Sequence, residues 1–226
     1  MRLLVLALTL LVAACDGGSD KSPAPRNTVD PSNPSSWEIG PVINGRNSSE
    51  GVPLHPFTVA DGVAFEIPTN GSVHYVTFRH GSLTGASRLV LRYRLDLPPS
   101  VTIVPTSDHA APTMLSLYFQ RAGDDWSGRG KFEAYRWFAS GYTVTPLAPG
   151  EHSVDVPLAS DSTVNGQWAW TAVETSSAGS ASGAYRDALV NADRVGFVLG
   201  GGTGLGHGVT AVGGPARFVV EDFRVE

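Results

Sequence analysis

The chain has 226 residues, a formal net charge of -5 and 16% charged residues. This mildly acidic balance lacks the excess of Lys and Arg with which proteins neutralise phosphate groups, so we expect no nucleic-acid partner. The sequence contains 1 cysteine, which excludes an internal disulfide.

The first fourteen residues have the pattern of an export signal. Met1 and Arg2 form a short positive start, an almost unbroken apolar run follows over residues 3–12, and two alanines come before Cys15. About ten apolar residues fit the core of a signal peptide and fall short of the roughly twenty that span a bilayer as a helix. We therefore expect residues 1–14 to be a signal peptide that is removed.

The string Leu-Val-Ala-Ala-Cys at residues 11–15 resembles the processing box of bacterial lipoproteins. The resemblance implies that the Cys15 thiol carries a lipid, which makes the membrane a partner and places the protein in the cell envelope, facing the periplasm. It also implies that Asp16 favours the inner membrane, a rule that varies between bacteria, so the choice between inner and outer membrane stays open. The alternative is an ordinary signal peptide followed by a chance cysteine.

Residues 15–36 are rich in Gly, Ser, Pro and Asp and contain almost no apolar side chains. Such a composition cannot bury enough surface to order itself, and it predicts a disordered tether. The rest of the chain, residues 37–226, shows no internal repeat and no second linker. Its length suits one all-β domain with a sizeable core.

Short runs rich in Val, Thr, Tyr, Phe and Trp alternate with polar residues and are separated by Gly, Pro, Asn and Asp, which predicts strands. The expected strands are 64–67, 73–79, 88–95, 101–104, 114–121, 131–138, 142–145, 152–156, 168–173, 194–199, 209–212 and 216–225. Only residues 181–192 have helical spacing. We predict an all-β jelly-roll sandwich of two antiparallel sheets with one short helix.

Four segments of the C-terminal third carry a second resemblance. They are residues 168–173, 185–189, 194–201 and 216–225. Their pattern and order resemble the galactose-binding-like jelly rolls found among carbohydrate-binding modules, which implies a glycan or polysaccharide partner. Such modules often hold a structural calcium ion, for which Glu38, Glu221 or Asp222 offer hard oxygen ligands. No cofactor and no other metal are expected.

Alternate side chains of a strand project to opposite faces, so strand parity predicts which residues leave the core. If the strands 73–79, 88–95, 114–121 and 131–138 share a sheet, nine side chains gather on its outer face. They are Tyr75, Arg79, Arg92, Arg94, Tyr118, Gln120, Glu133, Tyr135 and Trp137. Arg136 falls on the core side, which fits its charge poorly.

This predicted face suits a glycan. Sugar rings stack their C–H faces on Tyr and Trp, while Arg, Gln and Glu replace the water lost by the hydroxyls. Arginine can also pair with acidic sugars through its bidentate fork. The alternative is that the charges form cross-strand pairs and that a loop covers the aromatic side chains.

Two loops add candidates. The loop 121–130 places Asp124, Asp125, Trp126 and Arg129 near one end of the predicted face; the aspartates suit a turn, but Trp126 has no turn role. The glycine-rich stretch 200–208 lacks the spacing and the following helix of a nucleotide site. Its glycines favour positive φ and close packing, which leaves His207 as a ligand-facing or structural histidine.

No catalytic motif is present, because the histidines are scattered and there is no Gly-x-Ser-x-Gly elbow. We therefore predict a non-catalytic, carbohydrate-binding envelope lipoprotein. One alternative is a jelly-roll polysaccharide lyase or glycoside hydrolase built from dispersed groups. Such groups would be His74 or His80 with Tyr118, Arg79 and Glu133, or the carboxylates Glu133 and Asp125. Another alternative is a structural or partner-binding envelope lipoprotein.

Overall fold

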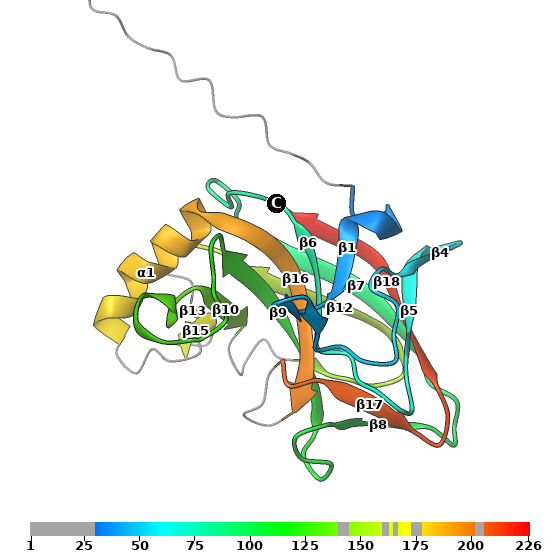
Figure 1. Ribbon diagram of the computed structural model, residues 1–226. Coiled ribbons are helices and arrows are strands. Elements are labelled where there is room, and N and C mark those ends of the chain that lie inside the picture. Colours follow the sequence, from blue (N-terminus) through cyan, green and yellow to red (C-terminus); the bar gives the residue numbers. More distant parts are fainter. Residues whose placement is uncertain (1–29, 140–144, 160–162, 165–166, 173–177, 202–205) are drawn as a thin grey trace, which may run out of the picture.

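A computed structural model of the chain describes residues 30–139, 145–159, 163–164, 167–172, 178–201 and 206–226. These residues form two antiparallel sheets packed face to face, with one α-helix at one end (Figure 1). Successive strands pass repeatedly from one sheet to the other, as in a jelly roll. The predicted all-β sandwich with a single helix is confirmed.

The larger sheet has the strand order β1-β6-β16-β9-β10-β15, and β11 also pairs with β9. Its strands are β1 (Trp37–Gly40), β6 (Tyr75–Arg79), β16 (Ala192–Gly201), β9 (Thr113–Arg121), β10 (Arg136–Ala139), β15 (Trp170–Ala172) and β11 (Thr145–Pro146). The central strand β16 joins β6 to β9 and carries a register shift between Ala192 and Arg194. Strands from distant parts of the sequence therefore meet at the middle of this sheet.

The smaller sheet has the order β12-β7-β18-β5-β4. Its strands are β12 (Gly150–Pro157), β7 (Arg88–Asp96), β18 (Ala216–Val225), β5 (Gly62–Ile67) and β4 (Phe57–Val59). Short strand pairs lie outside the two sheets: β2 (Val42–Ile43) with β3 (Arg46–Asn47), β8 (Thr102–Pro105) with β17 (Val209–Val212), and β13 (Thr163–Val164) with β14 (Gln167–Trp168). The two sheets cover each other's apolar faces, which leaves each with an outer face.

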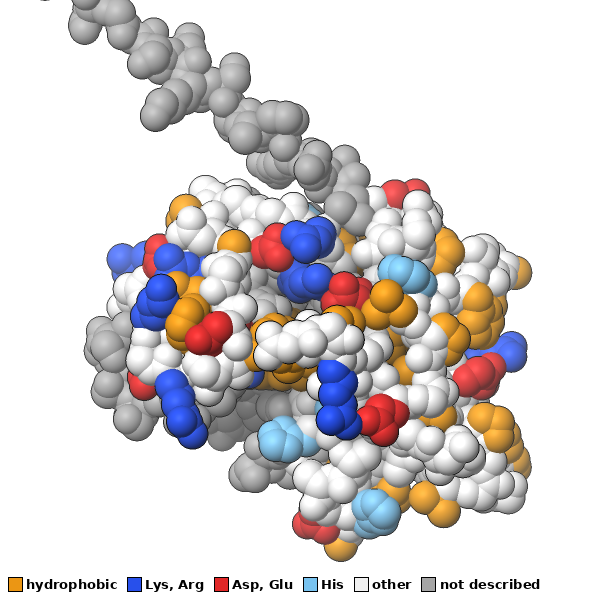
Figure 2. Space-filling view, viewed as in Figure 1, with side chains coloured by type: hydrophobic (Ala, Val, Ile, Leu, Met, Phe, Trp, Pro, Cys, Tyr) orange, Lys and Arg blue, Asp and Glu red, His pale blue; other side chains and the backbone are white. Residues whose placement is uncertain are grey.

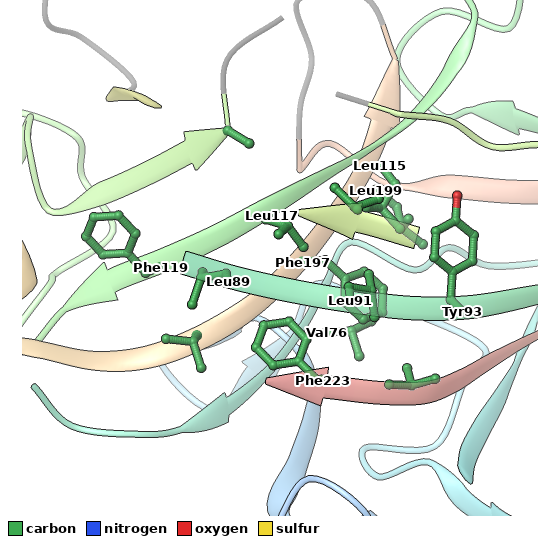
Figure 3. Packing of buried hydrophobic residues seen from close by; sticks show 14 of the residues in the cluster. Val76, Leu89, Leu91, Tyr93, Leu115, Leu117, Phe119, Phe197, Leu199 and Phe223 are labelled. Atoms are coloured by element: carbon green, nitrogen blue, oxygen red, sulfur yellow. The ribbon is translucent and has the colours of Figure 1, made fainter. Parts of the chain in front are cut away.

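The core lies between the two sheets. Figure 3 shows Leu117 and Phe197 of the larger sheet packing toward Leu91 and Phe223 of the smaller one. The helix α1 (Ala178–Val190) closes one end of this core, where Tyr185 is buried among aromatic side chains of the larger sheet. The part of the chain that the structure describes contains no helix long and apolar enough to cross a membrane.

Trp37 anchors the start of the sandwich. Its side chain is fully buried, its ring centroid lies 4.7 Å from that of Phe78 and 5.7 Å from that of Phe223, and its indole N–H donates to the Pro31 carbonyl at 2.8 Å. Just before it, residues 30–36 form a turn and the 3-10 helix η1 (Pro34–Ser36), capped by the Asn33 side chain. The described chain therefore makes ordered contacts before β1 begins.

Two predictions about the outer face are wrong. The strand expected at residues 88–95 is β7, and it lies in the smaller sheet, so Arg92 and Arg94 are on the opposite side of the sandwich from Tyr75. The expected grouping fails because alternation within a strand reveals its two faces but not the sheet to which it belongs.

The strand expected at residues 131–138 also differs. A 3-10 helix, η2 (Gly130–Phe132), occupies its first part, and β10 begins only at Arg136. As a result Trp137 faces the core, stacked near Phe119, while Arg136 and Phe138 point outward. Gly130, with φ of 57°, starts the turn that shifts the parity by one residue. The expected strand at 142–145 lies outside the described residues except for Thr145.

Candidate functional site

The outer face of the larger sheet carries the candidate site. Cross-strand neighbours place Phe138 beside Tyr118, Tyr118 beside Gly196, and Gly196 beside Thr77. Tyr75 follows on the same face of β6. The residues of β6 and β9 that were predicted to point outward do so in the structure. The apolar residues that alternate with them on the two strands are all part of the core.

An aromatic cluster occupies the middle of this face. Tyr75 is its centre: its ring centroid lies 5.1 Å from that of Tyr118, 5.4 Å from that of Trp126 and 6.5 Å from that of Phe138. Burial raises the pKa of Tyr75 to about 12 and that of Tyr118 well above its usual value. Both phenols are therefore neutral at physiological pH.

Trp126 lies over this cluster in an unusual backbone conformation. Its φ of 65° is in the left-handed region, where a bulky residue is a rare outlier. The Asp124 carboxylate accepts the Trp126 backbone N–H at 3.0 Å, and the Arg136 guanidinium lies over the indole at 5.2 Å from its centroid. Strained conformations of this kind persist where the surroundings hold them, and they concentrate at binding sites.

A buried ionic network holds the loop that carries Trp126 against the sheet. The Asp124 side chain is 1% exposed and the Arg136 side chain 11% exposed, and their closest nitrogen and oxygen atoms are 3.1 Å apart. The Gln120 amide also donates to Asp124 at 2.9 Å. Asp124 therefore joins β9, β10 and the Trp126 loop, a role that exceeds the turn function expected of it.

Beside Trp126 lies a groove of about 460 Å³, a volume within the range of small-ligand sites. Its walls combine aromatic and polar side chains. Among the residues that line it are Tyr75, Trp126, Phe138, His74, Arg136 and His207. Figure 2 shows hydrophobic side chains next to charged ones on the face that carries β1, β6 and β16.

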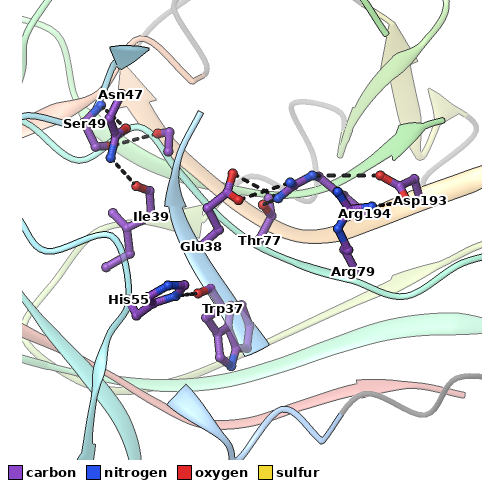
Figure 4. Close-up of polar contacts among 11 residues, drawn as sticks. Trp37, Glu38, Ile39, Asn47, Ser49, His55, Thr77, Arg79, Asp193 and Arg194 are labelled. Carbon is purple, nitrogen blue, oxygen red and sulfur yellow. Dashed lines mark hydrogen bonds and ion pairs between the residues drawn. The ribbon is translucent and has the colours of Figure 1, made fainter. Parts of the chain in front are cut away.

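A smaller hollow of about 120 Å³, called here the hollow, lies on the other side of the wall formed by Tyr75 and Trp126, which line both spaces. Glu38, Thr77 and Arg194 also line it. Figure 4 shows Arg194 reaching toward Glu38 and Thr77; its closest contact with the Glu38 carboxylate is 3.1 Å. The wall therefore separates an aromatic groove from a polar hollow.

The end of the glycine-rich stretch packs directly against the site. A side chain at Gly206 would place its Cβ 2.6 Å from the Tyr75 hydroxyl, and one at Gly208 would meet the His74 ring at the same distance. Both glycines have positive φ. The expectation of positive φ and close packing is confirmed for these two residues, while residues 202–205 lie outside the described part. His207, between them, is exposed and lines the groove.

The remaining predicted ligand-binding residues do not join this site. Arg79 is exposed and pairs with Asp193 at 3.2 Å, and Arg92 lies 4.0 Å from Glu221 on the smaller sheet. Glu133 accepts the Gly130 N–H at 3.1 Å, and Tyr135 is buried beneath the Arg121 guanidinium. Trp137, as noted, belongs to the core.

Two residues of the site, Arg136 and Phe138, escaped sequence reasoning, and a third, His74, was named only as a candidate catalytic group. The sequence did contain a warning at Arg136. A charged residue assigned to the core suggests that the inward and outward positions of the predicted strand are shifted by one residue. His74 lies just before β6, between the fully buried Val73 and Tyr75. Because Tyr75 was assigned to the outer face, alternation placed its neighbour His74 on the core side. Its proximity to Gly206 and Gly208 arises only from the fold.

The carboxylates proposed for calcium are each bound to arginine. Glu38 pairs with Arg194 at 3.1 Å, Glu221 lies 3.4 Å from Arg94, and Asp222 lies 2.9 Å from Arg224. Glu38 is in the larger sheet and the other two are in the smaller one, so the fold does not bring them together. Among the described residues no group of three or more His, Cys, Asp or Glu could hold a metal ion.

The groups named for catalysis serve local structure. Asp125 accepts the Ser127 N–H at 2.8 Å and Glu133 bonds Gly130, so both carboxylates stabilise turns. His74 contacts the Ser72 hydroxyl at 2.9 Å and the Gly206 carbonyl at 3.1 Å. The His80 backbone N–H donates to the Asp193 carbonyl beyond the end of β6. Of these four groups, His74 lines the groove.

Comparison with known proteins found no match to any family model, curated protein or solved structure.

His74 is expected to make folding sensitive to acid. Burial lowers its pKa below the usual 6.5, so the unfolded chain takes up this proton at a higher pH than the folded chain does. The free energy of unfolding should therefore fall as pH drops below 6.5. We expect His74→Gln to show a smaller loss than the native chain between about pH 8 and about pH 5.5 in denaturant titrations. Identical losses in the two proteins would contradict this expectation.

Removing the Tyr118 hydroxyl should cost nothing. This oxygen is buried without a hydrogen-bond partner in the described structure, so Tyr118→Phe is expected to raise the free energy of unfolding by about 0–1 kcal/mol. Tyr185→Phe is the matched control, because the Tyr185 hydroxyl donates to the Leu158 carbonyl and its loss should destabilise by about 1 kcal/mol. Chemical denaturation measures the free energy of unfolding of both variants. A larger decrease for Tyr118→Phe than for Tyr185→Phe would show that the Tyr118 hydroxyl does have a hydrogen-bond partner.

Proposed function

We propose that the protein is a non-catalytic carbohydrate-binding protein whose glycan lies in the groove beside Trp126. The observation that carries the proposal is Trp126 itself, which is held in a strained conformation by Asp124 and forms the wall shared by the groove and the hollow. A tryptophan serving only as a loop residue would not need this support.

The chemistry of the groove suits a sugar. The apolar C–H face of a pyranose stacks on aromatic rings, which Trp126, Tyr75 and Phe138 supply. Ring hydroxyls need donors and acceptors to replace water, and the exposed His207 lies on the same walls. With the expected lipid at Cys15, which is outside the described residues, such a domain would hold glycans at the membrane surface of the envelope.

The test is a glycan-array and calorimetric screen of the full chain alongside Trp126→Ala. We expect saturable binding without release of shortened products, and a loss of roughly tenfold or more in affinity for the variant. Phe57→Ala is the control, because Phe57 is an exposed aromatic residue of β4 on the smaller sheet. Binding that survives Trp126→Ala, or the absence of any bound glycan, would reject the proposal, and product release would indicate an enzyme instead.

A further inference from the structure

The arginines that line the groove and the hollow are already paired. Arg136 lies 3.1 Å from Asp124, and Arg194 lies 3.1 Å from Glu38. Arg121, the third, lies 2.7 Å from Asp187 of the helix α1. A guanidinium that already holds a carboxylate gains little from a second one, because the ligand would have to displace the first.

The charges around the hollow balance once every ion pair is counted. Glu38, Asp124 and Asp193 line it, against Arg121 and Arg194. Arg121 pairs with Asp187, Asp124 with Arg136 and Asp193 with Arg79, so a residue outside the hollow compensates each of these charges. An acidic sugar would therefore find no unpaired cation there, and burying its carboxylate without a partner costs several kcal/mol.

The buried polar atoms beside the site that lack a hydrogen-bond partner belong to two neutral groups and to Arg136, whose Nε lies 3.1 Å from the Asp124 carboxylate and is paired with it by charge. The Gln120 side-chain oxygen and the Tyr118 hydroxyl are both buried, and neither has a hydrogen-bond partner in the described structure. Gln120 lines the hollow and contributes no charge to it. In the groove, burial lowers the pKa of His74, which keeps its imidazole uncharged near neutral pH.

From this balance we infer that the ligand is a neutral glycan, and that the site discriminates against uronic, sialylated and sulfated sugars. The inference rests on the proposed function, since it specifies the ligand of the same site. It replaces the earlier expectation that arginines would bind acidic sugars: Arg79 pairs with Asp193, while Arg92 and Arg94 lie on the other sheet. A neutral glycan can bind without disturbing these ion pairs.

The test uses matched probes that differ only in charge. Each acidic oligosaccharide on the array is paired with its methyl-esterified or desulfated counterpart, and calorimetry follows for every pair that binds. We expect the bound glycans to be neutral, with acidic counterparts weaker by on the order of tenfold or more. Tighter binding of an acidic member would overturn this inference while leaving carbohydrate binding intact. Binding of neither class would reject the proposed function and the inference together.

A charge variant gives an independent readout. Asp193→Asn removes a carboxylate from the hollow and releases Arg79, so it should shift the affinity ratio toward the acidic member of a bound pair by at least about threefold. Asp155→Asn is the matched control, because Asp155 pairs with Arg88 at 2.8 Å on the smaller sheet and should leave the ratio unchanged. An unchanged ratio in Asp193→Asn would contradict the inference.

Discussion

Replacing Asp124 by alanine is expected to lower the free energy of unfolding by about 3–5 kcal/mol, because it leaves a buried guanidinium without its partner. The carboxylate is 1% exposed and lies 3.1 Å from Arg136. It also accepts hydrogen bonds from the Gln120 amide and the Trp126 N–H. Glycan binding should weaken with it, since the support for the Trp126 conformation is lost.

A double-mutant cycle separates the buried charge from other causes. Asp124→Ala combined with Arg136→Met should be less destabilising than the sum of the two single changes, because the orphaned charge is then absent. Asp125→Ala is the matched control, since Asp125 is exposed and its hydrogen bonds come from the neighbouring Ser127. Additive single effects, or a loss below about 1 kcal/mol for Asp124→Ala, would show that the network does not hold the loop.

Trp37→Ala is expected to cost about 3–5 kcal/mol, the range for truncating a fully buried large aromatic side chain. The change opens a cavity beside Phe78 and Phe223 and removes the hydrogen bond from the indole to Pro31. Trp37→Phe should cost less, because a ring still fills most of the space. Denaturant titration measures both variants, and a loss below about 1 kcal/mol for Trp37→Ala would contradict the assigned packing.

The fold class and part of the site could be predicted from the sequence. On β6 and β9 every second residue is apolar, so the outward positions of Tyr75, Tyr118 and Gln120 follow directly from alternation. The strand at residues 216–225 has the predicted bounds. The helix, expected at 181–192, spans Ala178–Val190. These elements have strong local patterns that the tertiary fold does not override.

The rest depends on long-range pairing. Nothing local shows that β7 joins β18 and β12 and thereby takes Arg92 away from Tyr75. The parity of β10 depends on the turn around Gly130, and the outward direction of Arg136 depends on Asp124 in a separate loop. Strand β1 was not predicted at all, although Trp37 and Ile39 alternate with Glu38 as a half-buried strand requires.

The most direct test of the glycan site is to map the backbone amide chemical shifts of the full chain while the tightest oligosaccharide from the array is added. We predict concentration-dependent shifts at Trp126, Gly206 and His207, which surround the groove, and no shifts along β7 and β12 of the smaller sheet. Shifts confined to the smaller sheet would contradict the site at Trp126 and place the glycan on the opposite face of the sandwich.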